Sequence, residues 1–345
     1  MPVTLGLALF SNEPIDKTAE LAKQAETLGF KNLWIPDEKF FRDPYCTMTV
    51  CSQVTKKIRI GIGITDPYTR RLPFTASSIA TVNEISQGRA MLGIGAGGAG
   101  LKSMGLNRTN PVKTIRDAVT ILRALLRGEA VSWKSNTITL ADAKINFTSG
   151  SIPIYVGAYG PKTLQMAGEI ADGVLLGSGA GASPASIAYA SEQIKAGARK
   201  AKRDPESIER VSWVHSVICD DSKKALQLIK PTVAISIWNS RAVIRELPYG
   251  VWGDDVDHAI KVMETEYTTG HEAHDSGALS NLSKTISDEV AAKLSVSGTP
   301  SECLEKFKNI KSTGIKQISI VFPGTDKDRR KSLELFAKEV LPELV

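Results

Sequence analysis

The stretch Gly61-Ile-Gly-Ile-Thr-Asp-Pro-Tyr-Thr-Arg70 is the part of the sequence that decides the fold. A β-rich apolar run leads into it, the chain turns at Asp66-Pro67, and a helical pattern follows that ends at Glu84-Ile-Ser-Gln-Gly-Arg89. A strand followed by a helix is the unit from which parallel sheets are built. The fold class therefore depends on how often this unit recurs along the chain.

The same alternation of strand and helix runs from one end of the chain to the other. Eight short apolar runs predict strands at Thr4–Phe10, Asn32–Pro36, Ile58–Thr65, Ala90–Gly95, Ile154–Ala158, Gly173–Gly177, Val211–Cys219 and Lys316–Phe322. Apolar residues at i, i+3 and i+4 predict helices at Ile15–Leu28, Thr75–Ile85, Thr114–Leu126, Lys162–Ala171, Ser186–Ala201 and Pro300–Ser312. Eight such units favour a closed α/β (β/α)8 barrel over an open doubly wound sheet, which usually has about six strands.

Two segments interrupt this alternation within the expected single domain of residues 1–345. Ala130–Ser151 reads as a hairpin with its turn at Ser135-Asn136. Residues 220–299 are too long for one barrel helix, so we expect a helical insertion before the last strand. Such an insertion can cover the rim at the carboxyl ends of the strands or pack on the outside, and the sequence leaves both open.

The composition indicates which partners and which cellular compartment to expect. The 345 residues carry 43 basic and 37 acidic side chains, and these charges are interspersed instead of gathered, so we expect no nucleic-acid partner. Four cysteines without a CxxC pair favour a reducing cytoplasm. No window reaches the roughly 18 to 20 apolar residues of a membrane-spanning helix.

Several motifs together resemble a known family. They are the stretch 61–70, Asn12-Glu-Pro14, Trp34-Ile-Pro-Asp37, Leu92-Gly-Ile-Gly-Ala-Gly97, Ile152-Pro-Ile-Tyr-Val-Gly-Ala-Tyr-Gly-Pro161 and Ala167-Gly-Glu-Ile-Ala-Asp-Gly173. In combination they resemble the luciferase-like superfamily, and within it the archaeal methylenetetrahydromethanopterin reductases. The resemblance implies a barrel enzyme that binds coenzyme F420, or FMN in other branches, across the carboxyl ends of its strands.

The resemblance also implies an activity and an assembly. It predicts an oxidoreductase that transfers a hydride between F420 and a small organic substrate, such as a methylene-tetrahydropterin or tetrahydrofolate one-carbon carrier. An FMN-dependent monooxygenase or reductase and a non-catalytic flavin-binding relative are the two alternatives. Members of the family usually form homodimers or homotetramers.

Glycines at the predicted strand ends indicate where a cofactor would approach the backbone. Gly95, Gly97 and Gly157 have no side chain that would occupy the volume of a planar ring, although loop glycines that need a positive φ are the alternative. The resemblance implies a non-proline cis peptide at Gly63-Ile64, beside Thr65. The other expected cofactor-binding residues are Ala96, Ala158, Tyr159, Gly160, Pro161, Gly177 and Ser178.

The cofactor phosphate needs donors, and one turn provides them. Gly160-Pro161-Lys162-Thr163 begins a predicted helix, where free N–H groups and the helix dipole favour an anion. Plain capping of the helix is the alternative for this turn.

Two neighbouring carboxylates, Asp37 and Glu38, are the candidate catalytic residues. Asp37 ends the second strand at the expected catalytic face, and the family places an aspartate beside the ring there, to position or to protonate. Glu38 replaces the family's usual histidine, and Ala8 stands where pterin reductases of the family carry a glutamate. The loss of that acid puts pterin reduction in question because the pterin nitrogen must be protonated.

Two other motifs do not predict function. Gly93-Ile-Gly-Ala-Gly-Gly98 matches the dinucleotide pattern, but it follows the fourth strand and no helix begins directly after it. His271-Glu-Ala-His274 lacks the i, i+4 spacing of a zinc helix, so we expect no metal. Arg70 and Arg89 could meet an acidic group of a substrate or form salt bridges, and only Arg70 is kept as a candidate.

Overall fold

A computed structural model describes residues 3–98, 100–177, 180–241, 254–266 and 283–344. Eight parallel strands close into a barrel in the order β1-β10-β9-β8-β7-β4-β3-β2, which confirms the predicted fold class. The strands are β1 (Thr4–Ala8), β2 (Asn32–Ile35), β3 (Arg59–Thr65), β4 (Ala90–Ile94), β7 (Ile154–Gly157), β8 (Gly173–Leu176), β9 (Glu209–His215) and β10 (Gln317–Val321).

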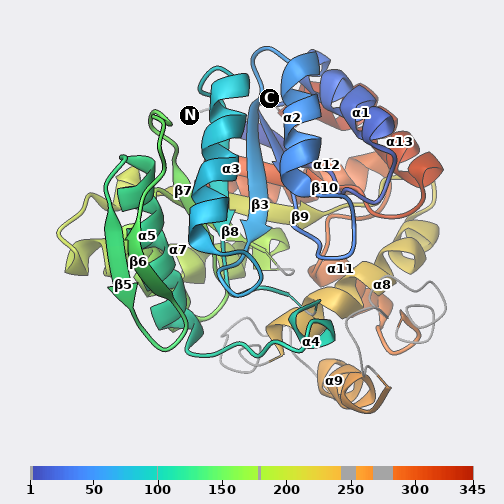
Figure 1. Cartoon of the computed structure of the whole chain (residues 1–345). Helices are drawn as coiled ribbons and strands as arrows, with labels where there is room; N and C mark the ends of the chain where they lie inside the picture. The colour runs from blue at the N-terminus through green and yellow to red at the C-terminus, as the bar shows by residue number, and fades with distance from the viewer. Residues whose placement is uncertain (1–2, 99, 178–179, 242–253, 267–282, 345) are drawn as a thin grey trace.

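Helices surround the barrel, as Figure 1 shows. Those between β1 and β9 are α1 (Ile15–Thr27), α2 (Pro44–Val54), α3 (Leu72–Ile85), α4 (Gly100–Ser103), α5 (Pro111–Leu126), α6 (Pro161–Ile170) and α7 (Pro184–Lys200). Those after β9 are α8 (Ser222–Ser240), α9 (Asp254–Glu266), α11 (Asp288–Lys293), α12 (Pro300–Ser312), α13 (Asp326–Leu335) and α14 (Leu341–Leu344). None of these described helices is long and apolar enough to cross a membrane.

The two interruptions are also visible. β5 (Val131–Lys134) and β6 (Thr139–Ala143) form the predicted antiparallel hairpin outside the barrel. α8, α9 and α11 lie between β9 and β10 in sequence and share a hydrophobic cluster of their own. Figure 1 shows α4, α8, α9 and α11 on the side toward which the β3 arrow points, which is the side of the carboxyl ends.

One predicted strand end was wrong. The apolar run Val211–Cys219 suggested a strand up to Cys219, but β9 ends at His215. The Ser216 hydroxyl donates to the Val296 carbonyl, and Ile218 forms a parallel bridge with Gly298. The last residues of the run therefore pair with the segment that returns from the insertion.

Side chains fill the inside of the barrel, as they do in other barrels of this type. The inner cluster consists of Ala8, Trp34, Met91, Tyr155, Leu175, Val211, Trp213 and Val321, with Phe10 and Ile64 packed against it. At the amino-terminal end, the Tyr155 hydroxyl donates to Glu209, and an Arg59 Nη donates to Tyr155 over 3.4 Å. This polar group closes one end, so the site has to lie at the other.

Candidate functional site at the carboxyl ends of the strands

Asp37 lies directly after β2 and is held by three side chains. Its Oδ2 accepts hydrogen bonds from Thr65 Oγ1 at 2.7 Å and Arg70 Nε at 2.8 Å, and Lys39 Nζ lies 3.2 Å away. Burial alone would raise the pKa of Asp37, but Lys39 and the hydrogen bonds from Arg70 and Thr65 outweigh it and hold the pKa below its ordinary value. Of the two predicted roles, this geometry favours positioning over protonation.

The network continues into two further carboxylates. Arg70 Nη2 lies 2.7 Å from Asp43 Oδ2, and Asp43 Oδ1 also caps the amino end of α2. Lys39 Nζ lies 2.8 Å from Asp66 Oδ2, and the other Asp66 oxygen accepts backbone hydrogen bonds in the predicted Asp66-Pro67 turn. Arg70 therefore joins the ends of β2 and β3 to α2, and its charge is already paired.

Glu38 has the opposite titration behaviour. Its side chain is partly exposed, yet burial raises the pKa of Glu38 above its ordinary value; Lys39 lowers it and Asp37 raises it further. A carboxyl group with a raised pKa keeps its proton to a higher pH than an ordinary carboxyl group does. Of the two predicted catalytic residues, Glu38 is thus better suited to exchange a proton.

The bulge of β3 contains the expected cis peptide, and it gives the glycines at the ends of β4 and β7 a role other than the expected one. The register against β4 shifts between Ile62 and Thr65, and the Gly63-Ile64 peptide is cis, as the resemblance implies. The bulge places Ile64 against β4 and β7: a Cβ added at Gly95 would meet Ile64 Cδ1 at 2.2 Å, and one at Gly157 at 2.7 Å. These two glycines make room for Ile64, so Ile64 covers the backbone to which a ring was expected to come close.

Gly97 fits the alternative interpretation, a loop glycine that is needed for its positive φ. Its φ is +74°, and a Cβ there would meet Leu101 Cδ1 at 2.8 Å. Its carbonyl accepts a hydrogen bond from Arg108, and the neighbouring Ala96 packs against the main core. The helix that follows, α4, is a single turn, in line with the rejection of a dinucleotide site.

The predicted anion turn lies at the start of α6. Gly160 is the N-cap, and no side chain among the described residues caps the helix. Pro161 occupies the first turn, and Lys162 is exposed beside it. Ala158 is buried, and the Tyr159 ring lies 3.3 Å from where a Cβ of Gly177 would be. The free N–H groups at this helix start are suited to bind a phosphate. Ser178 lies outside the described residues.

His215 also lies at the carboxyl end of a barrel strand, and the sequence analysis assigned it no role. It is the last residue of β9, and its side chain is partly exposed. Burial lowers the pKa of His215 to about 4. The sequence does not show that His215 lies at a strand end, because the apolar run continues to Cys219 although β9 ends at His215.

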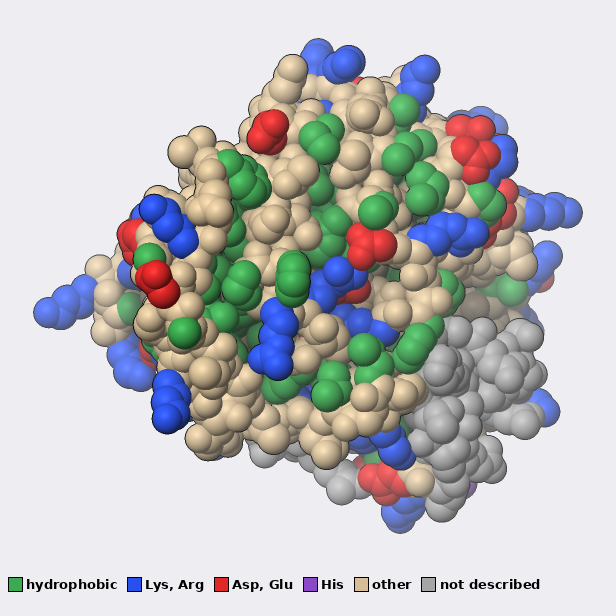
Figure 2. All heavy atoms as spheres, viewed as in Figure 1, with side chains coloured by type: hydrophobic (Ala, Val, Ile, Leu, Met, Phe, Trp, Pro, Cys, Tyr) green, Lys and Arg blue, Asp and Glu red, His purple; other side chains and the backbone are tan. Residues whose placement is uncertain are grey.

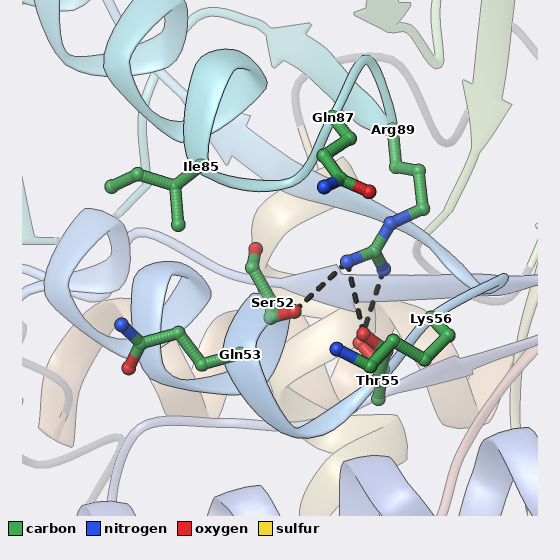
Figure 3. A pocket seen from close by; sticks show the side chains of 7 residues that line it. All are labelled: Ser52, Gln53, Thr55, Lys56, Ile85, Gln87 and Arg89. Atoms are coloured by element: carbon green, nitrogen blue, oxygen red, sulfur yellow. Dashed lines mark hydrogen bonds between the residues drawn. The ribbon is translucent and has the colours of Figure 1, made fainter.

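Arg89 has a structural role. It borders a hollow of about 320 Å³ where α2 and α3 end (Figure 3), and its guanidinium donates to the carbonyls of Ser52, Thr55, Ile58 and Ser86. The carbonyls at helix carboxyl ends lack partners within the helix, so Arg89 satisfies them. The described residues include no cluster of three or more metal-binding side chains, and His271 and His274 lie outside them.

The protein combines a closed barrel, a bulged third strand and the network of Asp37 at the carboxyl ends of the strands. Comparison with known proteins shows which class of enzyme has this fold. The family model of luciferase-like monooxygenases matches residues 2–317, and the chain belongs to that family. It is therefore an oxidoreductase of the luciferase-like type.

Particular relatives narrow the comparison. The chain is 35% identical to a 5,10-methylenetetrahydromethanopterin reductase of Methanolobus tindarius, over 98% of this chain and 100% of the relative. It is 35% identical to the enzyme of the same name from Archaeoglobus fulgidus, over 93% of this chain and 94% of the relative. The coenzyme F420-dependent tetrahydromethanopterin reductase structure from Methanopyrus kandleri superposes with a TM-score of 0.81 at 29% identity, covering 100% of both chains.

Proposed function

We propose that the protein transfers a hydride between coenzyme F420 and a small organic substrate at the carboxyl ends of its barrel strands. The observation that carries the proposal is the bulge of β3, which lies between the Asp37 network on one side and the uncapped start of α6 on the other. The relatives named for F420 chemistry make F420 the favoured cofactor, with FMN as the alternative.

The described residues fit such a cofactor. Ile64 and Tyr159 offer apolar and aromatic surface at the mouth, and the free N–H groups at the start of α6 suit its phosphate. Of the residues expected to bind the cofactor, those that remain proposed for a direct contact are Gly63, Ile64, Thr65, Ala158, Tyr159, Gly160, Pro161 and Gly177. Gly95 and Gly157 act indirectly by making room for Ile64, Gly97 and Ala96 shape the loop after β4, and Ser178 lies outside the described residues. When bound, F420 accepts or releases the hydride.

Asp37 and Glu38 have different roles in the proposed reaction. Asp37 stays ionised and keeps the ends of β2 and β3 in place through Thr65 and Arg70. Burial raises the pKa of Glu38, so Glu38 is the carboxyl group assigned to exchange a proton during the reaction. Ala8 provides no acid on β1, and the chain after β2, the strand paired with β1, carries Glu38 instead.

The first substrate to test is a methylene-tetrahydropterin or methylene-tetrahydrofolate, because it is the class that the relatives' names carry. An anaerobic assay would follow the loss of oxidised F420 absorbance with each candidate, beside FMN and oxygen as a second arm. Turnover with F420 supports the proposal. Turnover with FMN and oxygen alone, or cofactor binding without any turnover, would favour the two alternatives.

The outer face of α2 and α3 supports a homodimer or a homotetramer. α2 contains no charged residue, and Phe74 in the first turn of α3 is 73% exposed. Val54 and Ile85, the last residues of α2 and α3, are exposed as well. Figure 2 shows hydrophobic and uncharged side chains over much of this face. A face of this kind is typical of an interface between subunits.

All four cysteines are free, which supports a cytoplasmic location.

A further inference from the structure

The ammonium group of Lys39 lies between two buried carboxylates at the carboxyl ends of β2 and β3. Lys39 Nζ lies 2.8 Å from Asp66 Oδ2 and 3.2 Å from Asp37 Oδ2. The Lys39 side chain is 10% exposed, and those of Asp37 and Asp66 are 2% and 1% exposed. Ion pairs with so little exposure are screened much less by salt and water than surface pairs. Lys39 therefore connects the two strand ends through its charge.

The backbone of Lys39 belongs to a turn that begins at Glu38. The Phe41 N–H donates to the Glu38 carbonyl over 3.1 Å, so residues 38–41 form a turn after β2. This hydrogen bond closes the turn on itself, whereas the Lys39 ammonium connects the turn to the barrel. The side chain that is proposed to exchange a proton is thus the direct neighbour of the anchoring residue.

The loop after β4 packs against both partners of this ion pair. A Cβ added at Gly100, the first residue of α4, would meet Lys39 Cγ at 3.0 Å. A Cβ added at Gly97 would meet Asp66 Cγ at 3.2 Å. Glycine at these two positions lets the loop come close to Lys39 and Asp66 and keep water away from them.

We propose that Lys39 is a positioning residue of the site: it anchors the turn of residues 38–41 and thereby holds the Glu38 carboxyl group in place for proton exchange. This inference rests on the proposed function and adds a residue to it. Arg70 does not duplicate this role, because it pairs with Asp37 and Asp43. Among the described residues, Lys39 alone pairs with both Asp37 and Asp66.

Lys39 also contributes to the electrostatics around Glu38. Burial is the main cause of the raised pKa of Glu38, Lys39 opposes it, and Asp37 adds to it. The other charged groups on the elements that pack here are Asp43, Asp66, Arg70 and Lys102. Removing the Lys39 charge would raise the pKa of Glu38 further, so Glu38 would release its proton at a higher pH. Anchoring and charge therefore have separate effects that can be measured.

The kinetic test compares Lys39→Met and Lys39→Arg with the wild type across pH, and Lys223→Met, at an exposed position of α8, is the matched control. Reduced F420 and methylene-tetrahydrofolate are the substrates, and the gain of oxidised F420 absorbance reports turnover. We expect Lys39→Met to lose about 10- to 100-fold in kcat, with KM unchanged, because Glu38 is misplaced. The alkaline limb of its pH profile should move to higher pH, which loss of stability alone would not cause. Lys39→Arg keeps the charge and should retain most of kcat and the wild-type limb.

Asp66→Asn separates the anchor from the charge. Asparagine keeps an oxygen that accepts from the Tyr68 and Thr69 amides, but it removes the carboxylate that holds Lys39. We expect kcat to fall as it does in Lys39→Met, without a shift of the alkaline limb to higher pH, because a negative charge has been removed. This variant also carries the test if Lys39→Met does not fold.

A second measurement needs neither cofactor nor turnover. Hydrogen–deuterium exchange followed by mass spectrometry reports how often the turn of residues 38–41 opens. We expect faster exchange in this turn for Lys39→Met and Asp66→Asn, and wild-type exchange for Lys39→Arg and the Lys223→Met control. The inference is overturned if exchange in the turn does not change in Lys39→Met and Asp66→Asn, or if both variants keep the wild-type kcat. A wild-type protein that turns over no substrate with F420 would contradict the proposed function instead, and the exchange rates would still decide whether Lys39 anchors the turn.

Discussion

Asp37 and Glu38 are neighbours in the chain, yet their surroundings shift their pKa values in opposite directions. Asp37 accepts charge-assisted hydrogen bonds inside the protein, whereas desolvation dominates at Glu38. Pairs of carboxyl groups separated in this way are a common basis for dividing positioning and proton transfer between two residues. Each assignment gives a distinct expectation for stability as a function of pH.

Replacing Asp37 with asparagine should destabilise the protein by about 2–3 kcal/mol at pH 7, because hydrogen bonds to a charged group are lost. The folded pKa of Asp37 lies below 3.8, so its stabilisation is complete above that value and disappears as the pH falls through the folded pKa. Thermal unfolding at pH 7 and pH 3 measures this difference, with exposed Glu20→Gln as the control. A variant equally destabilised at both pH values would contradict the ionised role.

Glu38→Gln should have the reverse effect on stability. The folded pKa of Glu38 is raised above 4.5, so the carboxyl group opposes folding increasingly as the pH rises past 4.5. We expect a higher melting temperature at pH 8, an unchanged one at pH 4, and a fall in kcat of about 100-fold or more. Loss of stability at pH 8, or full activity, would show that Glu38 is an ordinary surface carboxylate.

At the scale of single elements, the bulge of β3 organises the mouth. It sends Ile64 across to β4 and β7, where Gly95 and Gly157 leave the space that its side chain fills. A methyl group at Gly95 would overlap Ile64, and overpacking of this kind typically costs about 1–3 kcal/mol.

We therefore expect Gly95→Ala to lower the free energy of unfolding by about 1–3 kcal/mol and to weaken cofactor binding. Adding Ile64→Ala should recover part of the loss, so the two substitutions will not be additive. Gly98→Ala is the control because a Cβ there meets nothing within 4 Å. Chemical denaturation measures Gly95→Ala, Ile64→Ala, the double variant and Gly98→Ala, and additive losses would exclude direct packing between positions 64 and 95.

Sequence patterns predicted the elements unevenly, for physical reasons. The barrel strands and the hairpin were predicted because apolar runs and turn residues depend on local sequence. α2 was not predicted: its segment Pro44–Val54 has no charged residue, so no polar face contrasts with a buried one. The end of β9 was wrong because Val217 and Ile218 remain apolar after the chain has changed partners.

The candidate site was predicted in position more than in role. Motifs singled out Asp37, Glu38 and the start of α6, but single-sequence reasoning could not tell which carboxyl group has its pKa lowered and which has it raised. That distinction depends on Lys39, Arg70 and Thr65, which the fold brings to Asp37.

At the scale of the whole molecule, the two ends of the barrel differ in chemistry. Arg59, Tyr155 and Glu209 close the amino-terminal end, while the network of Asp37 with Thr65, Arg70 and Lys39 lies at the carboxyl end. The side of the barrel formed by α2 and α3 carries the uncharged face. The assembly therefore leaves the mouth accessible if it uses this face.

Phe74→Glu should weaken the proposed assembly, because a buried unpaired charge is costly at an interface. We expect a shift toward monomer in light scattering after size-exclusion chromatography. Phe147→Glu, an exposed phenylalanine beyond the hairpin, is the control and should leave the mass unchanged. An unchanged mass for Phe74→Glu would place the interface elsewhere.

The most direct measurement is a fluorescence titration of the purified apo-protein with oxidised coenzyme F420, with FMN titrated in parallel. The account predicts saturable F420 binding, much weaker FMN binding, and reduced F420 affinity for Gly95→Ala. Preferential binding of FMN, or no binding of F420, would contradict the central claim that this barrel carries a deazaflavin.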